Sequence, residues 1–94
     1  MLGRTPTDRY KHSRFLGADA LTLYGKALHA ARRLNDPVGE GRALTDLGWV
    51  HQARGDHGPA GEHFEQALAA CRAAGDRRGE ARAREGLADL AHHI

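Results

Sequence analysis

The sequence predicts an all-α fold, and three observations support this prediction. Ala and Leu, which favour helices, occupy 28 of the 94 positions, whereas Val38, Val50 and Ile94 are the only β-branched aliphatic residues. Apolar residues recur at helical spacing rather than in alternation. Part of the chain is also repeated after 40 residues, and each copy reads as two helices. We therefore expect stacked helix pairs around one small core.

Residues 1–16 form a poorly patterned N-terminal segment, which we separate from a helical repeat domain over residues 17–94. Thr5-Pro6-Thr7-Asp8 has the composition of a loop and a helix cap, so a weaker helix is expected at about 7–14. Few apolar residues are present to hold this segment in place, and we expect it to fray.

The first well-patterned helix is expected over residues 17–34. Its apolar residues form one stripe with a 3.6-residue period: Ala20, Tyr24, Ala27, Leu28 and Ala31. Asp36-Pro37 follows, and it places a capping carboxylate before a proline at the first helical position. This pair predicts that a second helix spans residues 37–54.

The same plan recurs 40 residues later. Gly55-Asp56 ends the second helix and caps a third over 57–74, and Gly75-Asp76 does the same before a fourth over 77–92. With the short N-terminal helix this makes five helices. Between residues 27 and 47 the repeat gives 10 identities in 21 aligned positions, where composition alone predicts roughly two. The third helix repeats the stripe of the first: Ala60, Phe64, Ala67, Leu68 and Cys71.

A motif joins the second and third helices: Leu44-x-x-Leu47-Gly48-x-x-His51, Gly55-Asp56, then Ala60-x-x-x-Phe64-x-x-Ala67. It resembles the tetratricopeptide repeat, and its 40-residue spacing is similar to a longer bacterial variety found in large transcription regulators. The resemblance covers residues 17–94, about two and a half repeats. It implies a right-handed superhelical stack of antiparallel helix pairs, whose concave face binds a protein or peptide.

The chain departs from the family pattern at three positions. His51 replaces the usual aromatic residue, Ala88 stands at the glycine position, and Arg84 stands where the preceding repeat has Leu44. The last helix is therefore less apolar on its outer side, as expected of a helix that caps a stack. We expect His51 to occupy the aromatic slot between helices.

The resemblance also selects candidate partner-binding residues on the concave face. Trp and Arg are the side chains most enriched among binding hot spots. The candidates of the two repeats are Arg42, Thr45, Trp49 and Gln52, and then Arg82, Glu85, Asp89 and His92. Arg42 and Arg82 could receive carboxylates of a peptide. The alternative is that Trp49 fills a gap against the N-terminal helix while the arginines are merely solvated.

No catalytic site, metal site or cofactor is predicted. Cys71, the only cysteine, lies on an apolar stripe, and Ser13, the only serine, precedes the well-patterned region. Glu62-His63 lacks the second histidine of a zinc-binding helix, and no strand-to-helix phosphate loop is present. The sequence thus predicts a protein without enzymatic activity.

Charge and composition leave two weaker alternatives to a protein or peptide partner. One is nucleic-acid binding, although a net charge of +2 does not require it. The other is self-association, because a second copy could cover an exposed end of the stack and form a homodimer. A long apolar run and a secretory signal are both missing, so we expect a cytoplasmic protein without a membrane partner. The arginines that could touch phosphates are Arg32, Arg33, Arg72, Arg77, Arg78, Arg82 and Arg84.

Overall fold

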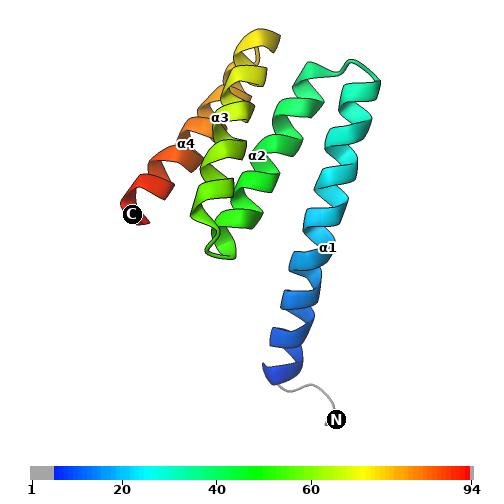
Figure 1. The fold of residues 1–94 in the computed structure, drawn as a ribbon, viewed down its shortest axis with the longest axis vertical. Coiled ribbons are helices and arrows are strands. Elements are labelled where there is room, and N and C mark those ends of the chain that lie inside the picture. Colours follow the sequence, from blue (N-terminus) through cyan, green and yellow to red (C-terminus); the bar gives the residue numbers. More distant parts are fainter. Residues whose placement is uncertain (1–5, 94) are drawn as a thin grey trace.

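The computed structural model describes the backbone of residues 6–93 and the side chains of residues 20–92. This part of the chain forms four helices and no strand. Consecutive helices run antiparallel and lie side by side (Figure 1). The all-α prediction is confirmed, and the last three helices agree with their predicted bounds to within one residue. The helices are α1 (Pro6–Arg33), α2 (Pro37–Ala53), α3 (His57–Ala74) and α4 (Arg77–His93).

The N-terminal part of the prediction is wrong in one respect. The expected short helix at 7–14 and the helix at 17–34 are a single helix, α1, so the described chain has four helices rather than five. Gly17 costs a helix interior only about 1 kcal/mol and ends a helix only where positive φ is needed. Pro6 stands at the first helical position, where a proline is tolerated. Residues 1–5 lie outside the described residues.

The loops between helices use residues that tolerate a left-handed backbone. Gly55 and Gly75 adopt φ values of 84° and 70°, as their positions after α2 and α3 predicted. At the corresponding place after α1 stands Asn35, with φ 54°. Asn is the non-glycine residue that reaches this region at low cost. All three turns therefore reverse the chain by the same local geometry.

The repeat reproduces hydrogen bonds as well as residues. Asp36 caps α2 by accepting a hydrogen bond from the Gly39 amide at 3.0 Å, and Asp76 accepts one from Gly79 at 3.1 Å. Forty residues also separate two ion pairs, Arg32–Glu40 at 3.2 Å and Arg72–Glu80 at 3.0 Å. Much of the sequence identity between the two copies thus maintains the same helix–turn–helix corner.

Helix α3 lies between α2 and α4, and glycines let both neighbours approach it closely. A Cβ atom added to Gly48 would lie 2.6 Å from the Phe64 ring, and one added to Gly86 of α4 would also collide with this ring. Gly41 and Gly79 meet the Cys71 sulfur in the same way. Phe64 and Cys71 are both fully buried. Each side chain is therefore held between two helix backbones, which explains why glycines occur inside helices despite their cost.

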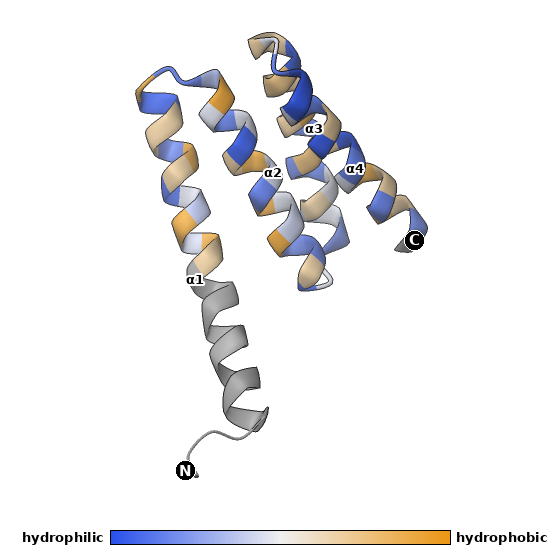
Figure 2. Cartoon of the chain, turned by 180° about the vertical axis from the view of Figure 1, so that it is seen from behind, coloured by the Kyte–Doolittle hydropathy of each residue, from blue (hydrophilic) through white to orange (hydrophobic). Residues whose placement is uncertain are grey.

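Polar and apolar residues are mixed along the coloured part of every helix in Figure 2, and none of these helices is apolar throughout. Over the described residues, none of the helices combines the length and the apolar character that crossing a membrane requires. The core is correspondingly small and rich in alanine. The buried apolar residues are Ala31, Ala43, Leu44, Leu47, Ala60, Phe64, Ala67, Cys71, Ala83 and Leu90.

Candidate functional site

The two helices predicted to form the binding face, α2 and α4, contact each other directly. Two polar links join them. Arg82 Nη2 lies 3.4 Å from Asp46 Oδ1, and the Gln52 side-chain amide donates a hydrogen bond to the Asp89 carboxylate. These links place the predicted residues of the two repeats on one surface, which we call the α2–α4 face.

Three of the predicted residues are exposed on this face. Arg42 lies one helical turn before Asp46, and Glu85 lies one turn after Arg82. Within the described residues, neither Arg42 nor Glu85 has an ion-pair partner, whereas Arg82 is held by Asp46. Gln52 and Asp89 are half-buried and joined to each other, and His92 is exposed near the end of α4. The α2–α4 face therefore offers charges of both signs.

Thr45 does not belong to the exposed face. Its side chain is 1% exposed, and its hydroxyl donates a hydrogen bond of 2.9 Å to the Gly41 carbonyl in the preceding turn of α2. Asp46 stands on the exposed side instead and was not among the predicted residues. The family register places a position only to within a neighbouring residue of the helix, whereas the packing of the neighbouring helices on α2 decides which residue is covered.

Trp49 is partly buried where α2 meets the core. Its ring packs edge-on against Phe64, with ring centroids 5.3 Å apart and an interplanar angle of 75°. It adjoins the cluster formed by Ala60, Phe64 and Leu90, so it lies between α2, α3 and α4 rather than against α1. Trp49 thus packs against the core beneath the α2–α4 face, and its side chain is only partly exposed.

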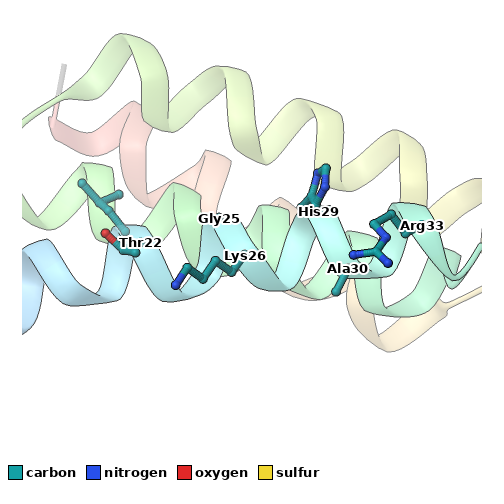
Figure 3. Close-up of a pocket in the computed structure, with 7 residues that line it drawn as sticks. Thr22, Gly25, Lys26, His29, Ala30 and Arg33 are labelled. Carbon is teal, nitrogen blue, oxygen red and sulfur yellow. The ribbon is translucent and has the colours of Figure 1, made fainter.

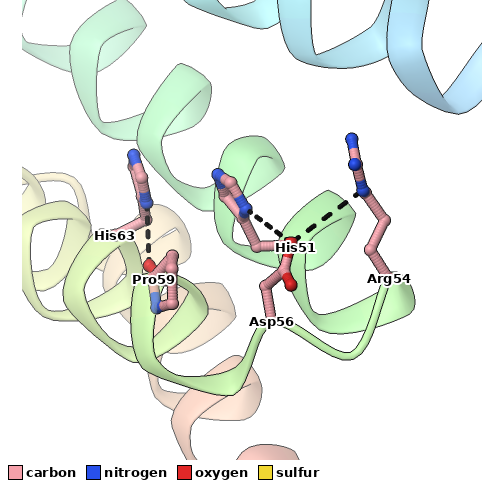
Figure 4. Close-up of polar contacts among 5 residues, drawn as sticks. All are labelled: His51, Arg54, Asp56, Pro59 and His63. Carbon is pink, nitrogen blue, oxygen red and sulfur yellow. Dashed lines mark hydrogen bonds and ion pairs between the residues drawn. The ribbon is translucent and has the colours of Figure 1, made fainter.

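Histidines and an aspartate gather where α2 turns into α3 (Figure 4). The rings of His51 and His63 stack with centroids 5.0 Å apart and an interplanar angle of 19°. His63 Nδ1 donates to the Pro59 carbonyl at 2.8 Å, and buried His51 Nδ1 lies 3.7 Å from Asp56 Oδ2. His51 therefore packs between helices as predicted, but its ring partner is a second histidine.

The side chain of Cys71 occupies a core position rather than a reactive one. Burial raises the pKa of its thiol, and the negative charges of Asp76 and Glu80 raise it further, while Arg82 acts weakly in the opposite direction. The thiol therefore stays protonated and is a poor nucleophile. Among the side chains that the structure describes, no three His, Cys, Asp or Glu residues come together as metal ligands would.

The arginines proposed for phosphate contacts are largely engaged with acidic side chains. Arg32 pairs with Glu40, Arg72 and Arg84 both pair with Glu80, and Arg82 pairs with Asp46. Four of the seven arginines thus have an acidic partner within the chain, and two of them share Glu80. This pairing lowers the positive potential that nucleic-acid binding would need.

Comparison with known proteins supports the family resemblance. A protein-family model described as "Tetratricopeptide repeat" matches residues 15–73, which is more than half of the chain and spans α2, α3 and the second half of α1. No curated protein and no solved structure matches the chain.

Proposed function

The chain belongs to the tetratricopeptide repeat family, whose repeats generally mediate protein–protein interactions and are typically non-catalytic. From this premise we propose that the chain binds a peptide segment of a protein partner on the α2–α4 face. One observation carries the proposal. Two polar links hold the corresponding helices of successive repeats side by side, so that Arg42, Arg82 and Glu85 share one exposed surface.

The charges of this face favour a peptide with a carboxylate. Arg42 is exposed and has no ion-pair partner among the described residues, so it can accept a carboxylate without losing an existing contact. Arg82 meets Asp46 through a single contact of 3.4 Å, and its side chain is 44% exposed. A partly solvated pair of this kind is weak. An incoming carboxylate can therefore pair with Arg42 or compete with Asp46 for Arg82, and guanidinium groups suit bidentate recognition.

Trp49 supplies the apolar part of the face. Its ring is anchored on Phe64 and is therefore rigid, while its partial exposure leaves an edge for an apolar side chain of the peptide. Binding hot spots combine such an aromatic anchor with arginine. We expect a peptide that places one apolar residue within a few positions of an acidic residue.

The test is a selection from a displayed library of random 12-residue peptides on the immobilised full chain, followed by titration of the enriched peptides. We expect enriched peptides to contain Asp or Glu, and we expect Arg42→Gln to weaken their binding by about tenfold, as for loss of one charge-assisted contact. Arg33→Gln removes an exposed arginine of α1 and should leave the binding unchanged. Enriched peptides that bind the Arg42→Gln variant as tightly as the original chain would overturn the proposal.

Nucleic-acid binding and the link to bacterial transcription regulation gain no support from the site. The arginine pairing argues against the former, and the latter rests on the spacing of the repeat alone. Self-association has a structural argument of its own, on a different face.

A further inference from the structure

Helix α1 carries a row of apolar residues that no described part of the chain covers. Leu23 is 62% exposed and Leu34 is 77% exposed, and Ala27 and Ala30 between them are exposed as well. Leu34 follows the last residue of α1, but its amide still donates to the Ala30 carbonyl at 3.0 Å, so it continues the helical register. We call Leu23, Ala27, Ala30 and Leu34 the α1 seam.

The internal repeat shows that this row corresponds to one that is buried at Ala67 and half-buried at His63, Ala70 and Ala74. Forty residues later, Ala67 of α3 stands where Ala27 stands in α1, and Ala67 is fully buried against Leu44 of α2. His63 corresponds to Leu23, and it stacks on His51 of α2. Helix α3 thus has a helix packed on this face, whereas among the described residues α1 contacts only α2, through its other side. The α1 seam is a helix-packing surface without its helix.

We propose that a second copy of this chain covers the seam, with the two α1 helices packed antiparallel about a two-fold axis. The seam residues are spaced by four, three and four positions, and this spacing reads the same in both directions. In an antiparallel pair, Leu23 therefore lies opposite Leu34 of the second copy, and Ala27 lies opposite Ala30. Alternating spacing of three and four is that of a coiled-coil seam. Small residues at the centre allow the helices to approach closely, with a leucine pair closing each end.

A head-to-tail contact between α1 and the free side of α4 fits less well. On that side α4 has Ala88 at the position that Gly48 occupies in α2. A Cβ atom added to Gly48 would lie too close to the Phe64 ring, so the Cβ of Ala88 would hinder a helix from packing there in the same way. Helix α4 also presents Arg84, held to Glu80 at 2.8 Å, where α2 has Leu44. Burying Arg84 would cost the desolvation of its charge. The two-fold arrangement buries none of these groups.

The groove beside the seam supplies a second, independent signature. It is lined by Lys26, His29 and Arg33, together with Leu21, Thr22, Gly25 and Ala30 (Figure 3). Lys26 and Arg33 border the seam on one side, so in the antiparallel pair the basic borders of the two copies face each other. Salt screens this repulsion. We therefore expect the dimer to become tighter as the salt concentration rises, which is opposite to the behaviour of a complex held by ion pairs.

Sedimentation of the full chain over a range of concentrations tests the proposal. We expect a reversible species of twice the 10.2 kDa chain mass, with no larger polymer, and more of it at 0.5 M than at 0.05 M NaCl. Because each chain of the dimer carries the substitution, Leu23→Glu places two charges in the interface. The dissociation constant of the dimer should therefore rise by roughly 100-fold or more. Val38→Glu, at an exposed apolar site outside the seam, is the matched control and should leave the dimer intact. A monomer under all conditions, or equal effects of the two substitutions, would refute the seam dimer.

Two cysteine variants test the direction of the helices. Leu23→Cys and Leu34→Cys chains are mixed and oxidised gently, and the native Cys71 is fully buried and stays out of the reaction. The antiparallel pair predicts crosslinks mainly between the two different variants. Crosslinks mainly between two chains of the same variant would indicate a parallel pair. Loss of the dimer in an Ala88→Glu variant would indicate the head-to-tail contact. Either result would overturn the proposal.

Discussion

Adding one methyl group to Gly48 should destabilise this protein, although alanine is the better helix former. The added Cβ would lie 2.6 Å from two carbons of the Phe64 ring, where ordinary contacts are 3.4–4 Å. The ring has little room to move, because the Gly86 backbone of α4 approaches the same three ring carbons. Either α2 or the ring must move by about 1 Å to restore a normal separation.

The magnitude follows from two opposing effects. Replacing glycine by alanine inside a helix gains up to about 1 kcal/mol, whereas forcing an extra group into a packed core costs about 1–3 kcal/mol. With the full helix-propensity gain, we therefore expect Gly48→Ala to lower the free energy of unfolding by up to about 2 kcal/mol. For a domain of this size, each 1 kcal/mol lost corresponds to a decrease in Tm of roughly 4–8 °C. Gly25→Ala in α1 is the matched control, because nothing lies within 4 Å of its added Cβ, and it should raise the stability by about 0.5–1 kcal/mol.

Urea and thermal unfolding, followed by circular dichroism at 222 nm, measure both variants. The double variant Gly48→Ala/Phe64→Leu makes room for the methyl group and should recover part of the loss, with a coupling energy of about 1 kcal/mol. If Gly48→Ala stabilised the protein as much as Gly25→Ala does, Phe64 would not be held between the two helix backbones and the packing described above would be wrong.

Three further predictions concern caps, the thiol and the tryptophan. Asp36→Ala and Asp76→Ala should each lower the free energy of unfolding, measured with urea, by about 1 kcal/mol. Asp56→Ala should lower it less, because the Asp56 side chain makes no capping hydrogen bond. Equal losses in the three variants would contradict this prediction. Burial and neighbouring carboxylates raise the pKa of Cys71, so its reaction with a disulfide reagent at pH 8 should be slow in the folded protein and fast in urea. Immediate reaction without urea would count against the buried position. Trp49→Ala should lower stability by about 2 kcal/mol, and an unchanged unfolding midpoint would show that its contact with the core is unimportant.

The helices and turns could be predicted from sequence because their causes are local. A 3.6-residue apolar period, a capping aspartate and a glycine or asparagine in the left-handed region all act within one helical turn or one loop. The exception is α1, where the poor apolar patterning of residues 1–16 was read as a separate short helix although the backbone continues as one helix. The internal repeat also predicted that the α1–α2 pair and the α3–α4 pair are built alike. Duplicated residues such as Asp36 and Asp76 indeed make the same capping contacts.

The binding face could be predicted only in part. Arg42, Arg82 and Glu85, which the family register selected, are exposed, whereas Thr45 is buried; the register did not select Asp46, which pairs with Arg82. Neighbouring positions of a helix differ by about 100° in direction. The angle at which the neighbouring helices pack on α2 therefore decides which of two adjacent residues is covered, and no pattern within α2 contains that angle.

By itself, then, the sequence determined the number of repeats, the chain reversals and the apolar side of each helix, all of which depend on residues within a few positions of one another. Only the tertiary structure decided that Phe64 lies between Gly48 and Gly86, that His51 stacks on His63, and that the seam of α1 stays open. These features depend on the distance and angle between helices. Packing of complete side chains across several helices sets that geometry, and the order of residues along any one helix does not reveal it.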